Sequence, residues 1–280
     1  MIVVMGASGQ IGRALIERLD RWDAPRRAFV RQHQQGAQLG GDYVLGDFDD
    51  PDSIRRALAP GARLLLNGSL GPNFVDQQRR IIDLAAEVGI AQVVKVSVRD
   101  AAPGGLLGQG MHGEVETHLK RSGLPWTILQ PVGFMQNLPA DVVSADGEGR
   151  FHGSYGAGRV GYVDARDVAA VAAVVLTRPV GEDATLVVTG AEAPTHAEIA
   201  EVMSATLGRP VRYVDLTPSE MAERLRRAGM PAGLADDLAA LMSLVGDGRW
   251  AGTTSVVRDV TGRPPRTLAE FVAEHADAFR

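Results

Sequence analysis

The sequence predicts an α/β protein: a doubly wound parallel sheet followed by a smaller, mostly helical C-terminal lobe. Two observations lead to this prediction. Short apolar runs alternate with longer amphipathic segments along the first half of the chain, which is typical of strand–helix–strand units. The apolar runs are continuous and do not alternate with polar residues, which indicates strands with both faces buried.

Seven strands are expected, at residues 2–6, 26–31, 42–47, 63–69, 92–98, 126–131 and 185–190. Helical patterns separate several of them, at residues 12–19, 52–58, 78–89 and 115–123. This alternation predicts right-handed crossovers between parallel strands. We therefore expect residues 1–140 to form the larger domain, with its sheet completed by segments around residues 160–190.

After about residue 140 the alternation gives way to glycine-rich loops over residues 145–164 and then to mixed helices. Thr195 with Glu198, and Thr217 with Glu220, have the spacing of capping boxes, so each pair is expected to open an amphipathic helix. We expect residues 141–280 to form a substrate-binding lobe. Ligands of doubly wound folds bind outside the carboxyl ends of the strands, so this lobe is expected to cover that edge.

Composition excludes several classes of function. The 280 residues are 45% hydrophobic and 22% charged, with a formal net charge of −5, so the basic surface of a nucleic-acid-binding protein is lacking. The absence of cysteine excludes disulfides, thiolate catalysis and zinc–thiolate sites, and no metal site is predicted. The longest apolar stretch, residues 168–176, is far shorter than the roughly 20 residues that span a bilayer. With no targeting signature, we expect a cytoplasmic protein without membrane or nucleic-acid partners.

Gly6, Gly9 and Gly12 lie between the first strand and the first helix in the pattern G-x-x-G-x-x-G. The first glycine permits a tight turn, the second lets backbone N–H groups approach a pyrophosphate, and the third lets the helix pack on the strand. The flanking strand and helix favour this interpretation over a turn that serves packing alone, and they place the phosphate at the positive end of the helix dipole. The expected dinucleotide contacts here are Gly6, Ser8, Gly9, Gln10, Ile11 and Gly12.

The end of the second strand indicates which nicotinamide cofactor is preferred. An acid there would accept a hydrogen bond from the ribose 2′-hydroxyl of NAD, but this strand ends in Arg31. A guanidinium suits the 2′-phosphate of NADP, so NADP(H) is expected over NAD(H) unless Arg31 is simply a solvated surface residue. After the third strand, Asp47 and Phe48 are placed to contact an adenine, with a turn or cap as the alternative role of Asp47. Further cofactor contacts are expected at Asn67, Gly68 and Ser69.

Together with the glycine turn and Arg31, several longer stretches resemble the NmrA-like atypical short-chain dehydrogenase/reductases, and most of all their bacterial NAD(P)H:quinone oxidoreductase-like branch. These stretches are residues 46–50, 124–137, 161–171, 207–221 and 261–275. The resemblance implies an NADP-binding Rossmann domain with a small C-terminal substrate lobe. It does not imply one activity, because the family includes quinone and enone reductases, isoflavone reductase-like enzymes and non-catalytic nucleotide sensors.

Typical short-chain reductases carry a Tyr-x-x-x-Lys pair: the tyrosine protonates the product alkoxide and the lysine holds the nicotinamide ribose. A glutamate commonly follows the lysine by four residues. Aligned on Glu116, the lysine position falls on His112 and the tyrosine position on Gly108. The resemblance thus implies that His112 orients the ribose, delivers a proton through a near-neutral titration, or lies on the helix surface. Ser97 stands in the place of the serine that assists carbonyl polarisation.

Gln130 occupies a position where relatives usually have arginine, which puts a family-typical salt bridge or substrate contact in question. The resemblance implies that Pro131, Gly133 and Phe134 line the nicotinamide, with core packing as the alternative for Phe134. The candidates for the substrate pocket are mostly aromatic, and several of them must serve packing. They are Phe134, Phe151, His152, Tyr155, Tyr162 and Trp250.

These features predict an NADPH-dependent reductase of quinones or of activated enone or aromatic polyketide-like substrates. Such acceptors take up a hydride without a strong local acid, because the resulting phenolate or enolate is stabilised electronically and takes its proton from water. Two alternatives stay open: an NADP(H) sensor that controls a protein partner, and a redox-neutral tailoring enzyme, such as a cyclase, epimerase or dehydratase, of a biosynthetic pathway. The expected partner is a small-molecule substrate, and a monomer or a homodimer is expected.

Overall fold

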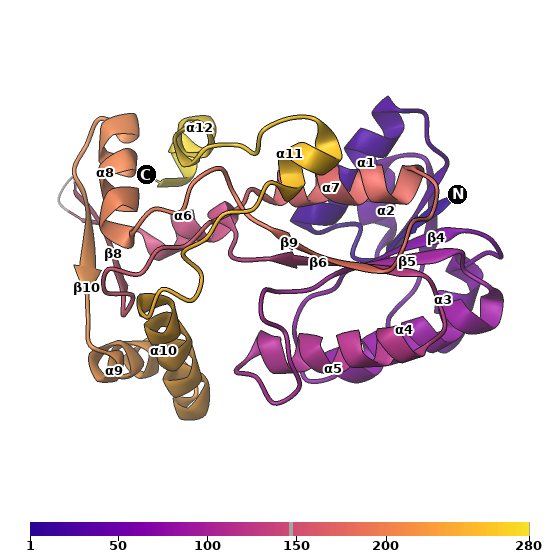
Figure 1. Cartoon of the computed structure of the whole chain (residues 1–280), viewed down its shortest axis with the longest axis horizontal. Coiled ribbons are helices and arrows are strands. Elements are labelled where there is room, and N and C mark those ends of the chain that lie inside the picture. The colour runs from indigo at the N-terminus through magenta and orange to yellow at the C-terminus, as the bar shows by residue number, and fades with distance from the viewer. Residues whose placement is uncertain (146–147, 280) are drawn as a thin grey trace. The chain divides into compact units, whose positions relative to one another are not determined.

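The computed structural model of the chain describes residues 1–145 and 148–279 (Figure 1). They form two compact units, each assembled from segments far apart in the sequence. The first unit comprises Met1–Pro131, Ala165–Val188 and Val256–Gly262. The second unit comprises Val132–Asp164, Thr189–Ser255 and Arg263–Arg280.

A seven-stranded sheet forms the centre of the first unit, in the order β3-β2-β1-β4-β5-β6-β9, and every neighbouring pair is parallel. The order reverses between β1 and β4, as in a doubly wound Rossmann sheet. The predicted fold is therefore confirmed. The strands are β1 (Ile2–Val4), β2 (Arg26–Val30), β3 (Asp42–Leu45), β4 (Arg63–Leu66), β5 (Gln92–Val96), β6 (Trp126–Pro131) and β9 (Ala184–Val188).

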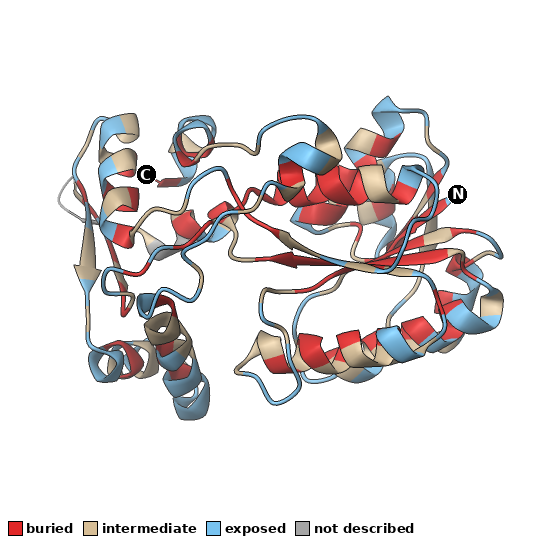
Figure 2. Ribbon diagram, viewed as in Figure 1, coloured by how far each residue is buried: buried red, intermediate tan, exposed pale blue. Residues whose placement is uncertain are grey.

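Helices cover both faces of this sheet (Figure 1). One layer contains α1 (Gln10–Arg21), α2 (His33–Leu39), α7 (Ala165–Thr177) and α11 (Val256–Thr261). The other layer contains α3 (Pro51–Ala57), α4 (Phe74–Val88) and α5 (Gly108–Arg121). Figure 2 shows that the strands are mostly buried and that these helices are buried along the side facing the sheet, as the continuous apolar strand sequences predict.

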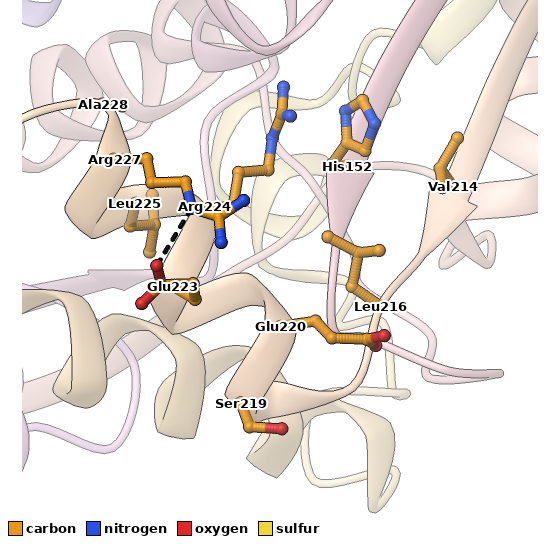
Figure 3. A pocket seen from close by; sticks show the side chains of 10 residues that line it. All are labelled: His152, Val214, Leu216, Ser219, Glu220, Glu223, Arg224, Leu225, Arg227 and Ala228. Carbon is orange, nitrogen blue, oxygen red and sulfur yellow. Dashed lines mark hydrogen bonds and ion pairs between the residues drawn. The ribbon is translucent and has the colours of Figure 1, made fainter.

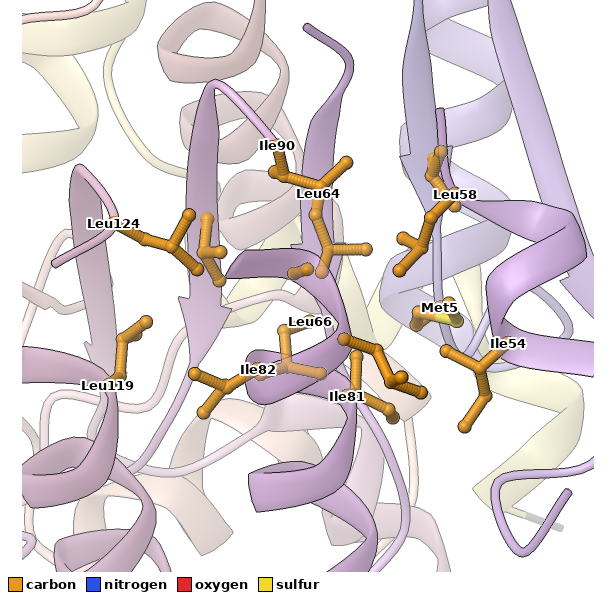
Figure 4. Close-up of a cluster of buried hydrophobic side chains, with 14 of the residues drawn as sticks. Met5, Ile54, Leu58, Leu64, Leu66, Ile81, Ile82, Ile90, Leu119 and Leu124 are labelled. Carbon is orange, nitrogen blue, oxygen red and sulfur yellow. The ribbon is translucent and has the colours of Figure 1, made fainter. Parts of the chain in front are cut away.

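A cluster of buried aliphatic side chains joins the sheet to α3, α4 and α5 (Figure 4). The sheet contributes Leu64 and Leu66, and the helices contribute Ile54, Ile82 and Leu119. Each side chain of this kind stabilises the fold by about 1.5–3 kcal/mol relative to an exposed position. This core fixes the position of the strands, and the loops that carry the candidate site follow their carboxyl ends.

The second unit contains a three-stranded sheet in the order β10-β8-β7. Strands β7 (Val143–Ala145) and β8 (Glu148–Gly153) are antiparallel, and β10 (Val211–Asp215) is parallel to β8. Helices make up most of the rest: α6 (Leu138–Asp141), α8 (His196–Leu207), α9 (Pro218–Arg227), α10 (Ala232–Gly246) and α12 (Leu268–Glu274), with 3₁₀ turns at Met135–Asn137 and Ala276–Phe279.

Of two sequence predictions for this unit, one is confirmed and one is wrong. The capping boxes of Thr195 with Glu198 and of Thr217 with Glu220 are both present, at the starts of α8 and α9. The expectation that residues 145–164 form only glycine-rich loops is wrong, because that range contains β8. Among the described helices, none has both the length and the apolar character needed to cross a membrane.

Candidate cofactor and substrate sites

The turn between β1 and α1 is packed too tightly for side chains at two of its three glycines. Gly6 has φ +69°, a conformation that favours glycine, and a Cβ there would lie 2.7 Å from the carbonyl oxygen of Asn67. A Cβ on Gly12 would lie 2.3 Å from the carbonyl oxygen of Gly6. At Gly9 the nearest such atom is 3.4 Å away. The packing of the turn therefore requires the first and third glycines, and leaves Gly9 for the close approach of a ligand.

The N-terminus of α1 presents backbone donors at this turn. Gly9 precedes the helix and supplies no side-chain cap. The helical hydrogen bonds begin with the N–H of Arg13, which donates to Gly9 O at 2.9 Å. The N–H groups of Gln10, Ile11 and Gly12 are thus the ones that a helix start leaves without helical partners. Together with the helix dipole they suit a pyrophosphate.

Arg31 directly follows β2 and is exposed. Its guanidinium makes no hydrogen bond or ion pair within residues 1–145 and 148–279. Two other arginines of this strand are already paired, Arg26 with Asp20 at 2.8 Å and Arg27 with Asp42 at 2.7 Å. Of these three arginines, Arg31 is therefore the one that remains available to a ligand phosphate.

The residues after β3 and β4 gather near this edge. Asp47 has a role in a turn, since its Oδ1 accepts a hydrogen bond from Asp49 N–H at 2.9 Å. Phe48 stacks on Phe29, with the ring centroids 5.6 Å apart. A Cβ on Gly68 would lie 3.3 Å from the Phe48 ring, so these two candidates are neighbours. Ser69 is exposed, and the side chain and carbonyl group of Asn67 lie against Gly6.

His112 of α5 is buried, and its main polar contact is with a residue that the sequence reasoning missed. Its Nδ1 lies 3.1 Å from Nζ of Lys95 in β5, and its ring packs edge-on against Phe74. Lys95 is fully buried. Its Nζ also donates to Val96 O at 3.1 Å and to Gln78 Oε1 at 3.4 Å. The three N–H donors of the ammonium group thus meet three acceptors.

The protonation of this pair differs from the sequence expectation. Burial lowers the pKa of Lys95 to about 7, and the charge of Glu116 opposes that shift. Burial and the charge of Lys95 lower the pKa of His112 to about 2. The expected near-neutral titration of His112 is therefore wrong. His112 is a neutral imidazole near neutral pH, and while Lys95 is charged, Nδ1 is the acceptor and the ring proton lies on Nε2.

Ser97, just after β5, belongs to a second buried network. Its Oγ donates to Glu116 Oε1 at 2.5 Å, and Gln130 Nε2 donates to the same oxygen at 2.9 Å. Lys120 reaches the other carboxylate oxygen at 3.3 Å. Gln130 thus donates to Glu116 from a neutral amide, at the position where relatives were expected to carry an arginine. At Gly108, the position expected for the family's tyrosine, Leu70 fills the space beside the backbone, since a Cβ there would lie 2.9 Å from its Cδ1.

Pro131 is buried at the end of β6 in the first unit, whereas Gly133 and Phe134 lie near the start of the second. Phe134 is half-buried and pairs with Val163 through a short backbone bridge. A Cβ on Gly133 would lie 2.8 Å from the ring of Tyr162. The second unit therefore places a candidate substrate aromatic directly against a residue expected beside the nicotinamide.

An aromatic cluster lies in the second unit. It consists of Phe151, Tyr155, Tyr162, His196 and Tyr213. The ring of Tyr155 stacks on His196 with centroids 3.6 Å apart, and Tyr162 Oη lies 3.1 Å from His196 Nε2. Burial lowers the pKa of His196 to about 4, against the opposing effect of Asp215. Three of the predicted substrate aromatics are thus neighbours around a neutral histidine.

His152 lines a different part of the second unit, and Trp250 is half-buried in the loop after α10. A pocket of about 770 Å³ separates β8 and β10 from α9, with apolar walls that include Leu216 and Leu225 (Figure 3). Arg224 extends toward His152 and makes no ion pair within the described residues (Figure 3). Burial, followed by the charges of Arg224 and Arg150, lowers the pKa of His152.

Lys95, His196, Tyr213 and Arg224 were not singled out from the sequence. Lys95 had a usable signal, since it is a charge inside a strand that was expected to be buried on both faces. His196 and Tyr213 had none, because their roles depend on contacts between distant segments. Within the described part of the chain, no group of three or more His, Asp or Glu residues is placed to hold a metal ion.

The chain is similar over its full length to proteins of known activity. It is 36% identical to the NAD(P)H azoreductase of Xenophilus azovorans, covering 100% of this chain and 99% of the relative. It is 32% identical to the (4-alkanoyl-5-oxo-2,5-dihydrofuran-3-yl)methyl phosphate reductase of Streptomyces griseus, covering 100% and 99% of the two chains.

A solved structure agrees with these similarities. The NADPH-dependent quinone oxidoreductase of Escherichia coli, in complex with NADPH, is 28% identical and superimposes with a TM-score of 0.85 over 98% of this chain and 99% of that one. The model of the NmrA-like family matches residues 1–272. The chain is therefore a member of the NmrA-like family.

Proposed function

We propose that this protein is an NADPH-dependent reductase of quinones and related conjugated acceptors, such as azo compounds and activated enones. The observation that carries the proposal is the turn at the start of α1, where two glycines are required by packing and Gly9 is left open beside the backbone N–H groups of the first helical turn. Relatives that match the whole chain are named as reductases of an azo compound, a quinone and a dihydrofuranone phosphate.

The first unit fits an NADP(H) molecule. The N–H groups of Gln10, Ile11 and Gly12 suit the pyrophosphate, and Arg31 is an exposed cation without a counter-ion in the described chain, which suits a 2′-phosphate. Phe48 and Gly68 form an adjacent surface at which an adenine would pack. When bound, NADPH supplies the hydride. Because Arg31 replaces an acid at the end of β2, we propose that NADPH is preferred over NADH.

The active-site polar groups favour a conjugated acceptor over a simple ketone. Gly108 offers no phenol, and the hydroxyl proton of Ser97 is directed at Glu116. Neither group is poised to protonate an alkoxide. A quinone or an enone yields a phenolate or an enolate, which is stabilised electronically and tolerates a weaker proton donor. We assign Ser97 to holding Glu116, and His112 to donating a hydrogen bond from Nε2 toward the cofactor ribose or the acceptor.

We propose that the second unit binds the acceptor. Phe134, next to Gly133, and Tyr155 and Tyr162 of the aromatic cluster are half-buried and provide flat apolar surface for a conjugated ring, and Trp250 is a further candidate. Phe151 of the same cluster is buried and packs in the core of the second unit. The ring faces are held by hydrogen bonds and stacking, so little conformational freedom would be lost on binding.

The full chain tests this function directly. NADPH and NADH affinities are measured by nucleotide fluorescence, and loss of reduced-nicotinamide absorbance is followed with a naphthoquinone, an azo dye, a cyclic enone and an unactivated ketone. We expect tight NADPH binding and turnover of the first three acceptors but not of the ketone. Tight NADPH binding with no turnover of any acceptor would overturn the reductase proposal and favour a nucleotide sensor.

A further inference from the structure

Lys95 is a buried lysine in a strand where an apolar residue would cost less free energy. Its cross-strand neighbours are Leu66 of β4 and Ile128 of β6, and its Nζ lies 5.4 Å from the centre of the Phe74 ring. Removing an ammonium group from water carries a large penalty unless its donors are satisfied. The burial of Lys95 therefore costs free energy that the packing of the strand does not require.

The groups around Lys95 are few and can be named. From α4 it meets Gln78 and the Phe74 ring, and from α5 it meets His112. The charged group that acts on it is Glu116, also on α5. Helix α7 covers the opposite face of the sheet (Figure 1). The only imidazole in contact with Lys95 among the described residues is therefore His112.

The hydrogen bonds of this pair set the tautomer of His112. An ammonium group has donors only, so Nδ1 must accept from Lys95 and the ring proton lies on Nε2. Nε2 makes no hydrogen bond within the described part of the chain. It is also not fully buried, so a ligand can reach it. The ring therefore joins a buried proton donor on one side to a nitrogen that a ligand can reach on the other.

We propose that Lys95 is the proton source for the reduced acceptor and acts through His112. This inference rests on the proposed reductase function. After a hydride from NADPH has been added to the β-carbon of an enone, the resulting enolate holds a new C–H bond and a negative oxygen. The Nε2–H proton of His112 passes to that oxygen while an Nζ–H proton of Lys95 passes to Nδ1. Lys95 is left as a neutral amine and His112 as the Nδ1–H tautomer. After product release a solvent proton enters at Nε2 while the Nδ1 proton returns to Nζ of Lys95, which restores the ammonium group and the Nε2–H tautomer.

The electrostatics of the site support this route. Since the pKa of His112 is lowered to about 2, an imidazolium does not form near neutral pH, and a proton must enter the ring as another leaves. The pKa of Lys95, lowered to about 7, suits a donor that works near neutral pH. Lys95 is thus a positioning residue that also supplies a proton, and His112 is the group that meets the acceptor.

The first test is nuclear magnetic resonance of the imidazole nitrogens in the uniformly ¹⁵N-labelled full chain, which needs no turnover. We expect His112 to show the Nε2–H tautomer between pH 5 and 6, where Lys95 carries its charge. In Lys95→Met, which has no donor, we expect a mixture of tautomers. Lys120→Met is the matched control, because Lys120 contacts Glu116 and not His112, and it should leave the tautomer unchanged. An Nδ1–H tautomer in the unmodified protein overturns the proposal.

The second test separates proton supply from positioning. Lys95→Gln keeps an N–H donor for Nδ1 but has no proton to give. We expect kcat to fall about 100-fold for an enone and less than about 10-fold for a quinone, because the more basic enolate depends more on an acid. The affinity for NADPH should change less than about 3-fold. In the unmodified protein, kcat for the enone should fall as pH rises through 7, and in Lys95→Gln it should be flat.

The outcomes distinguish the proposed reductase function from the proton-transfer step. An unmodified protein that reduces no acceptor overturns the proposed function and with it the proton-transfer step, while the tautomer measurement still decides whether Lys95 orients His112. Unchanged enone turnover in Lys95→Gln overturns the proton-transfer step alone. The imidazole and backbone spectra of each variant are recorded before its kinetics, so that a loss of activity caused by unfolding is recognised.

Discussion

Gly12 lies so close to Gly6 that a Cβ on Gly12 would stand 2.3 Å from the Gly6 carbonyl oxygen. The same turn leaves Gly9 in an extended conformation with φ −79° and ψ 173°, which any residue adopts, and a Cβ there would be 3.4 Å from its nearest neighbour. Two glycines of one motif therefore have different reasons to be glycine. The fold of the turn requires a glycine at position 12. It does not require one at position 9, where the close approach of a ligand would explain the glycine.

This difference predicts opposite results for two alanine variants. Gly9→Ala should keep the free energy of unfolding within about 0.5 kcal/mol and weaken NADPH binding about 10-fold or more, because the methyl group stands where the pyrophosphate approaches. Gly12→Ala should lower the free energy of unfolding by about 1–3 kcal/mol and weaken NADPH binding as well. Urea unfolding and fluorescence titration measure the two quantities.

The matched control for both variants is Gly181→Ala. Gly181 lies in an exposed loop before β9, and a Cβ there would have no neighbour within 4 Å. It should change neither stability nor affinity. If Gly9→Ala bound NADPH as tightly as the unmodified chain, the turn would serve packing alone and the cofactor proposal would lose its main support.

Arg31→Ala is predicted to change cofactor preference. A charge-assisted hydrogen bond contributes about 1.5–3 kcal/mol, so the Kd for NADPH should rise roughly 10- to 150-fold, while the Kd for NADH, which has no 2′-phosphate, should stay nearly constant. Arg121→Ala, another exposed arginine, lies at the opposite end of α5 from the strand carboxyl ends and is the control. Equal effects on NADPH and NADH would show that Arg31 does not read the 2′-phosphate.

The first unit was predictable because its signals are local. A parallel strand buried on both faces reads as an uninterrupted apolar run, and seven such runs are present. The glycine spacing also identified its turn. The buried contacts of Lys95 were less predictable. Lys95 follows two valines and precedes a third, so it appeared as an irregularity of an apolar strand. Its contact with His112 depends on how α5 is rotated against β5, which spacing along one helix does not fix.

The second unit was harder to predict for a specific reason. Strand β8 alternates as a half-buried strand should, with Gly149, Phe151 and Gly153 buried and Arg150 exposed. Two of its three buried positions are glycines, so the period-2 hydrophobic pattern is weak and the segment was interpreted as a loop. The aromatic cluster depends in turn on the packing of β8, β10 and α8 against one another, and no local sequence pattern predicts that packing.

The pocket of the second unit gives a prediction about His152. Burial contributes first and the charge of Arg224 second to lowering its pKa. Arg224→Gln should therefore raise the pKa of His152 toward its ordinary value of 6.5, and Arg150→Gln should raise it less. A pH titration of the imidazole resonance of His152 measures both. A larger effect of Arg150→Gln would show that Arg224 does not extend toward His152 in solution.

Lys95 gives a prediction about stability that is independent of turnover. Its pKa is about 7 in the folded chain, against 10.5 for an ordinary lysine. Between these values the unfolded chain binds more protons than the folded chain, so the free energy of unfolding rises with pH. The penalty for burying the charged form is fully present below pH 7 and is lost as pH rises toward 10.5. From pH 7 to 9 this one group should add about 2 kcal/mol.

Urea unfolding at several pH values measures this slope in three proteins. The unmodified chain should gain stability from pH 7 to 9 relative to Lys95→Met, which has no titrating group at this position. Lys120→Met is the control, because Lys120 is partly exposed and its ammonium group keeps contact with water. It should retain the slope of the unmodified chain, since Lys95 is unchanged. Parallel curves for the unmodified chain and Lys95→Met would mean that Lys95 stays charged across this range, which would remove it as a proton donor near neutral pH.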